Sequence, residues 1–148
     1  MFDTTSIAME TEMMKIFIVG NSSTFREQVL DAVSEIENIK IIGGSDSALE
    51  AIREIKRMLP DVVILDIRLQ AGTGLDVLHE IKREVKSPMT VIVMTNYPYE
   101  QYRRITIGMG ADYFFHKSTE FAEMVDVLKK MQSEGRPTTL YEAVQSVR

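Results

Sequence analysis

The sequence predicts an α/β fold, a single domain built on a five-stranded parallel sheet with helices on both faces. Short apolar runs alternate along the chain with longer segments whose apolar residues recur at helical spacing. Among the runs, residues 62–65 read VVIL without a polar break, which is typical of a strand buried on both faces. A chain of 148 residues is long enough for one well-buried core and short for two.

The expected strands are the short apolar runs, which cover residues 15–19, 39–43, 62–65, 90–94 and 112–116. The expected helices follow them in turn and cover residues 24–36, 47–59, 75–85, 99–108 and 119–132. Thr24 with Glu27 and Ser47 with Glu50 have capping-box spacing, and we expect Ser118 to be the N-cap of the last helix.

Five strands that alternate with five helices indicate right-handed crossovers and a doubly wound, flavodoxin-like sheet with strand order 2-1-3-4-5. In this order the carboxyl ends of strands one, three, four and five meet in one crevice, where open α/β sheets place their ligands. Those ends carry Gly20 with Asn21, Asp66, Thr95 and Lys117.

An aspartate, a hydroxyl and a lysine at one sheet edge suit the handling of a phosphoryl group. A carboxylate such as Asp66 is a nucleophile that can form an acyl phosphate. Thr95 would donate to a phosphoryl oxygen, and Lys117 would neutralise the developing charge. Each of these residues alone is an ordinary strand-end residue, so the prediction depends on the three lying together.

The order and spacing of these residues resemble the receiver domain of two-component response regulators. VVILDIRLQAGTGLDVL resembles the phosphoacceptor strand and its following helix, VIVMTN the strand that bears the threonine, and GADYFFHKS the strand that bears an aromatic residue and the lysine. The resemblance implies that Asp66 is the phosphoacceptor, that Thr95 and Phe114 are switch residues, and that Lys117 is the essential cation. It places the receiver domain at residues 15–132, between a flexible leader, 1–14, and a C-terminal tail, 133–148.

The resemblance also implies partners. A histidine kinase or a phosphotransfer protein would supply the phosphoryl group, and a downstream target protein or a second copy of the chain would receive the signal. The family's signalling surface lies over the fourth helix, fifth strand and fifth helix. Tyr99, Tyr102 and Arg103 fall there, and aromatic and arginine side chains are the ones that anchor interfaces. Receivers are not enzymes beyond the self-catalysed transfer of phosphoryl to their own aspartate.

The loop after the first strand departs from the family pattern. The family carries two adjacent acids there that bind Mg²⁺ together with the phosphoacceptor, but this chain has Gly20 and Asn21. Mg²⁺ prefers carboxylate oxygens in octahedral geometry. The remaining candidate ligands are Asn21, Asp66 and the backbone carbonyl of Arg68, so we expect Mg²⁺ binding and Mg²⁺-dependent phosphorylation to be weakened. The Arg68 side chain either points back over the pocket, as a partial substitute for the metal, or points to solvent.

A second departure is Ser118, which stands where the family has a proline preceded by a cis peptide bond. A cis bond before a residue other than proline costs about 2.5–4 kcal/mol, so the backbone at this position is an open question.

The composition limits the partners and the cellular location that we expect for the domain. The net charge of −5 argues against direct nucleic-acid binding, which draws its affinity from basic contacts to phosphate. The chain has no cysteine, which is compatible with any compartment. No apolar run approaches the ~20 residues of a membrane span, so we expect no membrane contact. The start of the chain lacks the apolar core of a secretory signal, so we expect a cytoplasmic protein.

Three other functions remain open at this stage. A phosphorylation-independent pseudo-receiver would signal through partner binding alone. A flavodoxin-like binder of FMN or another anion would use the small polar loop at 20–24 at a helix N-terminus. A hydrolase acting through an acyl phosphate on Asp66 would need a second acid close after it, where this chain has Arg68.

Overall fold

Five parallel strands form one sheet in the order β2-β1-β3-β4-β5, which confirms the predicted fold class and strand order. The computed structural model describes residues 13–97 and 100–134. The strands are β1 Met14–Val19, β2 Ile39–Ser45, β3 Val62–Leu65, β4 Thr90–Thr95 and β5 Tyr113–His116. The predicted strands match these within two residues at either end.

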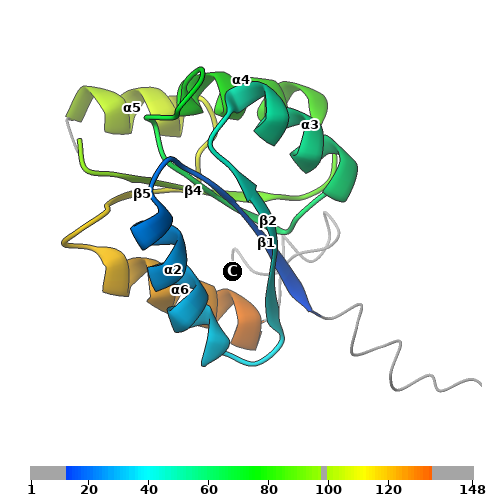
Figure 1. The fold of residues 1–148 in the computed structure, drawn as a ribbon, viewed down its shortest axis with the longest axis vertical. Helices are drawn as coiled ribbons and strands as arrows, with labels where there is room; N and C mark the ends of the chain where they lie inside the picture. Colours follow the sequence, from blue (N-terminus) through cyan, green and yellow to red (C-terminus); the bar gives the residue numbers. More distant parts are fainter. Residues whose placement is uncertain (1–12, 98–99, 135–148) are drawn as a thin grey trace, which may run out of the picture.

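The helices lie in two layers, one on each face of the sheet. They are α2 Ser23–Ser34, α3 Ala48–Met58, α4 Gly74–Glu84, α5 Glu100–Gly108 and α6 Phe121–Glu134. Figure 1 shows α2 and α6 side by side on one face, with α3, α4 and α5 on the other. Among the described residues no helix is both long and apolar enough to cross a membrane.

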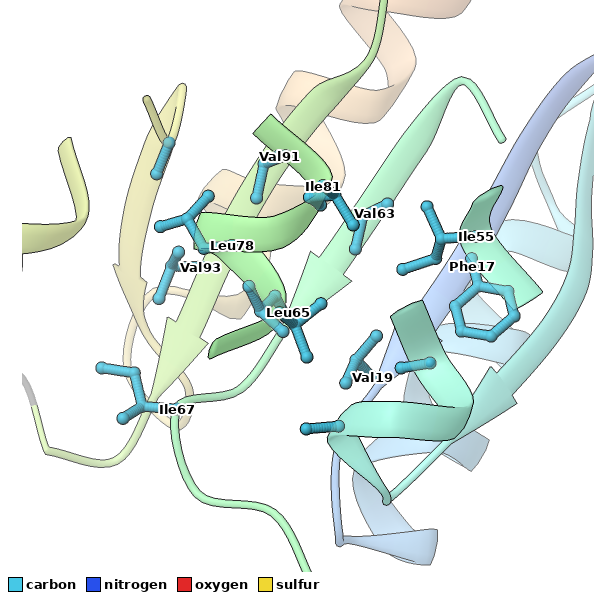
Figure 2. Close-up of a cluster of buried hydrophobic side chains, with 14 of the residues drawn as sticks. Phe17, Val19, Ile55, Val63, Leu65, Ile67, Leu78, Ile81, Val91 and Val93 are labelled. Carbon is cyan, nitrogen blue, oxygen red and sulfur yellow. The ribbon is translucent and has the colours of Figure 1, made fainter. Parts of the chain in front are cut away.

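The core is divided by the sheet into two clusters, and β3 supplies both. Val63 and Leu65 face the cluster under α3 and α4, whereas Val62 and Ile64 face the cluster under α2 and α6. Successive side chains of a strand point to opposite faces, so a strand covered on both sides must be apolar throughout. Figure 2 shows the first cluster, where the β3 side chains meet Ile55 and Leu78. The unbroken VVIL run is explained by this double burial.

One predicted N-cap is wrong, and a second is right in position but makes no capping hydrogen bond. The N-cap of α2 is Ser22 rather than Thr24, and its hydroxyl accepts a hydrogen bond from the Phe25 N–H at 3.1 Å. Ser47 does precede α3, but its side chain makes no capping hydrogen bond. The backbone at this helix start is bonded instead to the loop after β3, where Ala71 carbonyl accepts from the Ala48 N–H at 2.8 Å.

A capping box that the sequence analysis did not predict begins α4. The Thr73 hydroxyl accepts from the Asp76 N–H at 3.2 Å, and the Asp76 carboxylate accepts from the Thr73 N–H at 3.1 Å. Aspartate in place of the usual Glu or Gln at this position conceals the pattern. The box fixes where α4 starts after the loop that follows Asp66.

The start of α6 also differs from expectation, because Ser118 is not its N-cap. The helix begins at Phe121, and the Ser118 hydroxyl donates to Asn96 Oδ1 at 2.9 Å. The turn between β5 and α6 is held instead by His116, whose Nδ1 accepts from the Thr119 N–H at 3.1 Å. All peptide bonds of the described residues are trans, including the one between Lys117 and Ser118.

Candidate functional site

The sheet edge brings together three of the side chains that the sequence singles out. Asp66 directly follows β3, Thr95 ends β4, and Lys117 directly follows β5. The Asp66 N–H donates to the Val19 carbonyl at 2.9 Å, and the Lys117 N–H donates to the Thr95 carbonyl at 2.8 Å. The parallel register therefore continues one residue past the strands and holds all three residues in place.

Asp66 and Lys117 form a buried ion pair. The Lys117 Nζ lies 2.5 Å from Asp66 Oδ2, and each side chain is only 10% exposed. The other carboxylate oxygen, Oδ1, accepts from the Arg68 N–H at 3.3 Å. Lys117 is covered by Phe25, whose ring centroid lies 4.7 Å from its ammonium nitrogen. The carboxylate is thus held by charge on one oxygen and by backbone on the other.

Thr95 is fully buried, and its hydroxyl is held by the loop that follows it. The Thr95 Oγ1 accepts from the Tyr97 N–H at 3.0 Å. The Tyr97 ring in turn carries the Arg68 guanidinium, whose central carbon lies 4.1 Å from the ring centroid. Arg68 is exposed and rests on Tyr97 at the mouth of the site.

The start of α4 lies directly behind Asp66. A Cβ on Gly74 would overlap the carbonyl oxygen of Asp66, and the Gly74 N–H donates to the Ile67 carbonyl at 2.7 Å. Only glycine allows this close approach of two backbones. The position of the carboxylate is therefore fixed from behind by the helix as well as by the sheet.

Phe114 is buried, and an arginine of α5 lies over it. Phe114 is 4% exposed and belongs to the cluster under α3 and α4. The Arg103 guanidinium lies 5.1 Å from its ring centroid and donates to its carbonyl oxygen at 3.4 Å. Of the residues expected to form a partner surface, Arg103 is exposed, Tyr102 is half-buried against the core, and Tyr99 lies outside the described residues.

The loop after β1 offers little to a metal ion. Gly20 has no side chain, and Asn21 is exposed. Within residues 13–97 and 100–134, no three histidine, cysteine or acidic side chains are grouped so as to hold a metal. The remaining carboxylate, Asp66, is already paired with Lys117, so Mg²⁺ would have to compete with an ammonium for a single acidic ligand. This donor set does not fit Mg²⁺.

A cleft of about 660 Å³ adjoins the site between α2 and the start of α6. Lys117, Asn96 and Ser118 line its end at the sheet edge, and Phe25 and Phe121 form part of its wall. The two rings meet edge to face, with centroids 6.0 Å apart. Lys117 therefore borders this cleft, whereas Asp66 is not among its lining residues.

Two contacts of the site were not predicted from the sequence, the stacking of Arg68 on Tyr97 and the cover that Phe25 provides for Lys117. The contact between Arg68 and Tyr97 has a signal in the sequence. Each of the two stands two residues after a pocket residue, Asp66 or Thr95, on adjacent strands. No sequence signal distinguishes Phe25 from the other apolar residues of α2.

The chain belongs to the response regulator receiver domain family, whose family model matches residues 16–129. It is 25% identical over 122 residues to the sensory transduction protein LytT of Bacillus cereus, covering 82% of this chain and 48% of LytT. It is 31% identical over 107 residues to a protein-glutamate methylesterase/protein-glutamine glutaminase of Methanospirillum hungatei, covering 71% of this chain and 31% of that protein. The chain thus spans half or less of the length of these two relatives.

The fold is also similar to solved receiver structures. A DNA-binding response regulator of the LuxR family from Staphylococcus aureus superimposes with a TM-score of 0.72 at 25% identity, covering 81% of this chain and 99% of that one. The chain is therefore a receiver domain of the kind that signals in two-component systems. Receivers of this family interact with histidine kinases and downstream effectors, typically use Mg²⁺, and are generally not enzymes in their own right.

Proposed function

We propose that the domain receives a phosphoryl group on Asp66 and signals through protein contacts, with a weakened dependence on Mg²⁺. The observation that carries the proposal is the buried pair of Asp66 and Lys117, with the Thr95 hydroxyl held at the same sheet edge. This is the arrangement that an aspartyl phosphate needs, with a nucleophile, a fixed cation and a hydroxyl donor on three neighbouring strands.

Each residue has a distinct role in the transfer. A carboxylate oxygen of Asp66 attacks phosphorus and forms the acyl phosphate. Lys117 remains beside the carboxylate and neutralises charge that develops on the phosphoryl oxygens. The Thr95 hydroxyl, whose oxygen accepts from the Tyr97 N–H, donates its own proton to a phosphoryl oxygen.

The signal then passes to the surface around α5, β5 and α6. Phe114 is the switch residue beneath that surface, and Arg103 connects the two, because it contacts the Phe114 ring and carbonyl while its own side chain is 47% exposed. Tyr102 and Arg103 form the partner surface. We infer that a histidine kinase or phosphotransfer protein supplies the phosphoryl group and that a downstream protein or a second copy of the chain binds this surface.

A second candidate is a pseudo-receiver that signals without phosphorylation. The observation that favours it is that Lys117 already neutralises Asp66, so the charged residues of the pocket are compensated without a phosphoryl group or metal. In that case the partner surface is permanently in its binding form.

The intact mass of the protein after incubation with acetyl phosphate distinguishes the two functions. We expect the mass of one added phosphoryl group on the wild type and none on Asp66→Asn, whose folding is checked by circular dichroism. A wild type that stays unmodified both with and without Mg²⁺ would favour the pseudo-receiver function.

The partner surface is tested separately from phosphorylation. Tyr102→Ala and Arg103→Ala should each weaken binding of the downstream partner by tenfold or more if these side chains anchor the interface, because anchoring aromatic and arginine side chains carry ~2 kcal/mol or more. Arg53→Ala, an exposed arginine on α3, is the matched control. Unchanged partner binding by both variants would exclude this surface.

A further inference from the structure

Arg68 and Tyr97 contact each other beside the site. They come from the loops after β3 and β4, and the central carbon of the guanidinium lies 4.1 Å from the ring centroid. Their backbone N–H groups donate hydrogen bonds to two side-chain oxygens of the site, Asp66 Oδ1 and Thr95 Oγ1. The same two residues therefore contact Asp66 and Thr95 through their backbones and contact each other through their side chains.

The charge of the site is unusual for a phosphoryl acceptor that depends on a divalent cation. Asp66 and Lys117 cancel each other, and Gly20 and Asn21 add no charge, so the Arg68 guanidinium at the mouth leaves a positive excess. An acceptor pocket must offset the negative charge of an incoming phosphoryl group, which metal-binding sites do with the cation. Here the excess is supplied by the chain itself.

The guanidinium of Arg68 is suited to that task. It is planar and presents paired N–H donors that match two phosphoryl oxygens at once. Because the Arg68 N–H already contacts Asp66 Oδ1, the flexible side chain starts next to the carboxylate that would carry the phosphoryl group. Its contact with Tyr97 is a cation–π interaction at an exposed position, which is weak enough to be exchanged for a phosphoryl group.

We propose that Arg68 takes the place of the divalent cation in a metal-independent phosphorylation of Asp66, and that Tyr97 holds the guanidinium at the pocket mouth until the phosphodonor enters. This inference rests on the proposed function, since it requires Asp66 to be the acceptor. It assigns Arg68 as a catalytic residue that contacts the transferred group, and Tyr97 as a positioning residue that acts through Arg68.

The step is balanced with acetyl phosphate as the donor. A carboxylate oxygen of Asp66 forms a bond to phosphorus while the bond from phosphorus to the bridging oxygen breaks. Acetate leaves with the electron pair, and no external proton, oxidant or reductant is needed. Arg68 contacts two non-bridging oxygens of the phosphoryl group. Lys117 and Thr95 contact the remaining one.

The test measures the initial rate of phosphorylation by acetyl phosphate, from intact mass, in Mg²⁺ and in EDTA. The wild type should react at rates that agree within about twofold in the two conditions. Arg68→Ala should react at least ~10-fold more slowly in both, since a preorganised charge on a developing transition state is worth ~10²–10³ in rate. Arg68→Lys should recover part of the loss, because it restores the charge without the paired donors.

Two further variants separate a catalytic role from a structural one. Tyr97→Leu should react more slowly than the wild type but faster than Arg68→Ala, because the guanidinium is still present and only its positioning by the ring is lost. Arg53→Ala, which removes an exposed arginine of α3, should match the wild type. The urea midpoint of Arg68→Ala should equal that of the wild type, so that a slower rate does not reflect loss of fold.

The outcomes distinguish this inference from the proposed function. If the wild type is phosphorylated on Asp66 but Mg²⁺ accelerates it more than tenfold, or if Arg68→Ala reacts as fast as the wild type, the role of Arg68 is refuted and the acceptor role of Asp66 stands. A Tyr97→Leu variant that reacts as fast as the wild type would refute the holding role of Tyr97. If the wild type stays as unmodified as Asp66→Asn in every condition, both the inference and the acceptor role are refuted.

Discussion

The two halves of the site at the sheet edge are built differently. On one side, Asp66, Thr95 and Lys117 are buried, bonded to each other through side chain or backbone, and supported from behind by Gly74. On the other side, the loop after β1 carries Gly20 and an exposed Asn21, and adds no charge. We call the first the acceptor half and the second the β1–α2 loop.

The difference shows that the charges of the acceptor half balance each other without a group from outside the chain. A buried carboxylate without a counter-charge is costly. In this structure the counter-charge is Lys117, so the geometry of the half does not depend on a cation bound at the β1–α2 loop. Four variants, taken from the largest expected effect to the smallest, test this contrast.

Lys117→Ala should have the largest effect, because it leaves the Asp66 carboxylate buried and without its charged partner. We expect the free energy of unfolding to fall by about 3 kcal/mol, at the lower end for a broken buried pair because the Arg68 N–H still contacts Asp66. Urea denaturation measures it. The double variant Asp66→Ala/Lys117→Ala should be less destabilised than Lys117→Ala alone, and equal destabilisation of the two would show that the pair is not coupled.

Restoring the acids to the β1–α2 loop should make it resemble the metal-binding receivers. A Cβ at Gly20 would lie 3.6 Å from the Asp66 Cβ, an ordinary contact, so the backbone accepts a side chain there. Gly20→Asp/Asn21→Asp should bind Mg²⁺ at least ~10-fold more tightly than the wild type in calorimetric titration, because it supplies the carboxylates that Mg²⁺ prefers. A variant that folds but binds no more tightly would place the loss of affinity elsewhere in the site.

The β1–α2 loop also has a structural task, which Ser22→Ala isolates. The Ser22 hydroxyl caps α2, so its loss should lower the free energy of unfolding by about 1 kcal/mol in thermal or urea denaturation. Thr24→Ala is the matched control, since Thr24 is exposed and already inside the helix. An equal cost for the two variants would contradict the assignment of the cap.

Ser118→Ala should have the smallest effect. The Ser118 hydroxyl bonds Asn96 across the loops after β5 and β4, but the bond is exposed, so we expect a loss of about 0.5 kcal/mol. Urea denaturation measures this loss as well. A loss above about 1.5 kcal/mol would mean that the contact holds the acceptor half together, which we do not expect of an exposed bond.

The fold was predictable because its strongest determinant is local. The VVIL run of β3 has no polar residue, and burial on both faces of a parallel sheet is the simplest arrangement that requires this. Capping was predicted less well. Thr24 and Glu27 have the spacing of a capping box, but Ser22 is also a capping residue, and the position of β1 decides which of the two begins the helix.

The acceptor half was predictable in its membership but not in its contacts. Strand order places Asp66, Thr95 and Lys117 at one edge, because parallel strands end together. The 2.5 Å pairing of Asp66 with Lys117 and the stacking of Arg68 on Tyr97 depend on side-chain rotamers of residues far apart in sequence. Spacing along the chain places Arg68 and Tyr97 on neighbouring loops, but it does not determine the rotamer that brings the guanidinium over the ring.

The space for a Cβ at Gly20, next to Asp66, has a consequence for how the domain can evolve. Every glycine codon is one base change from a codon for aspartate or glutamate, and every asparagine codon is one base change from one for aspartate. A Cβ at position 20 meets no atom closer than 3.6 Å, so the first atom of an acidic side chain causes no clash there. The chain therefore lies two point mutations from a sequence with acids at both positions.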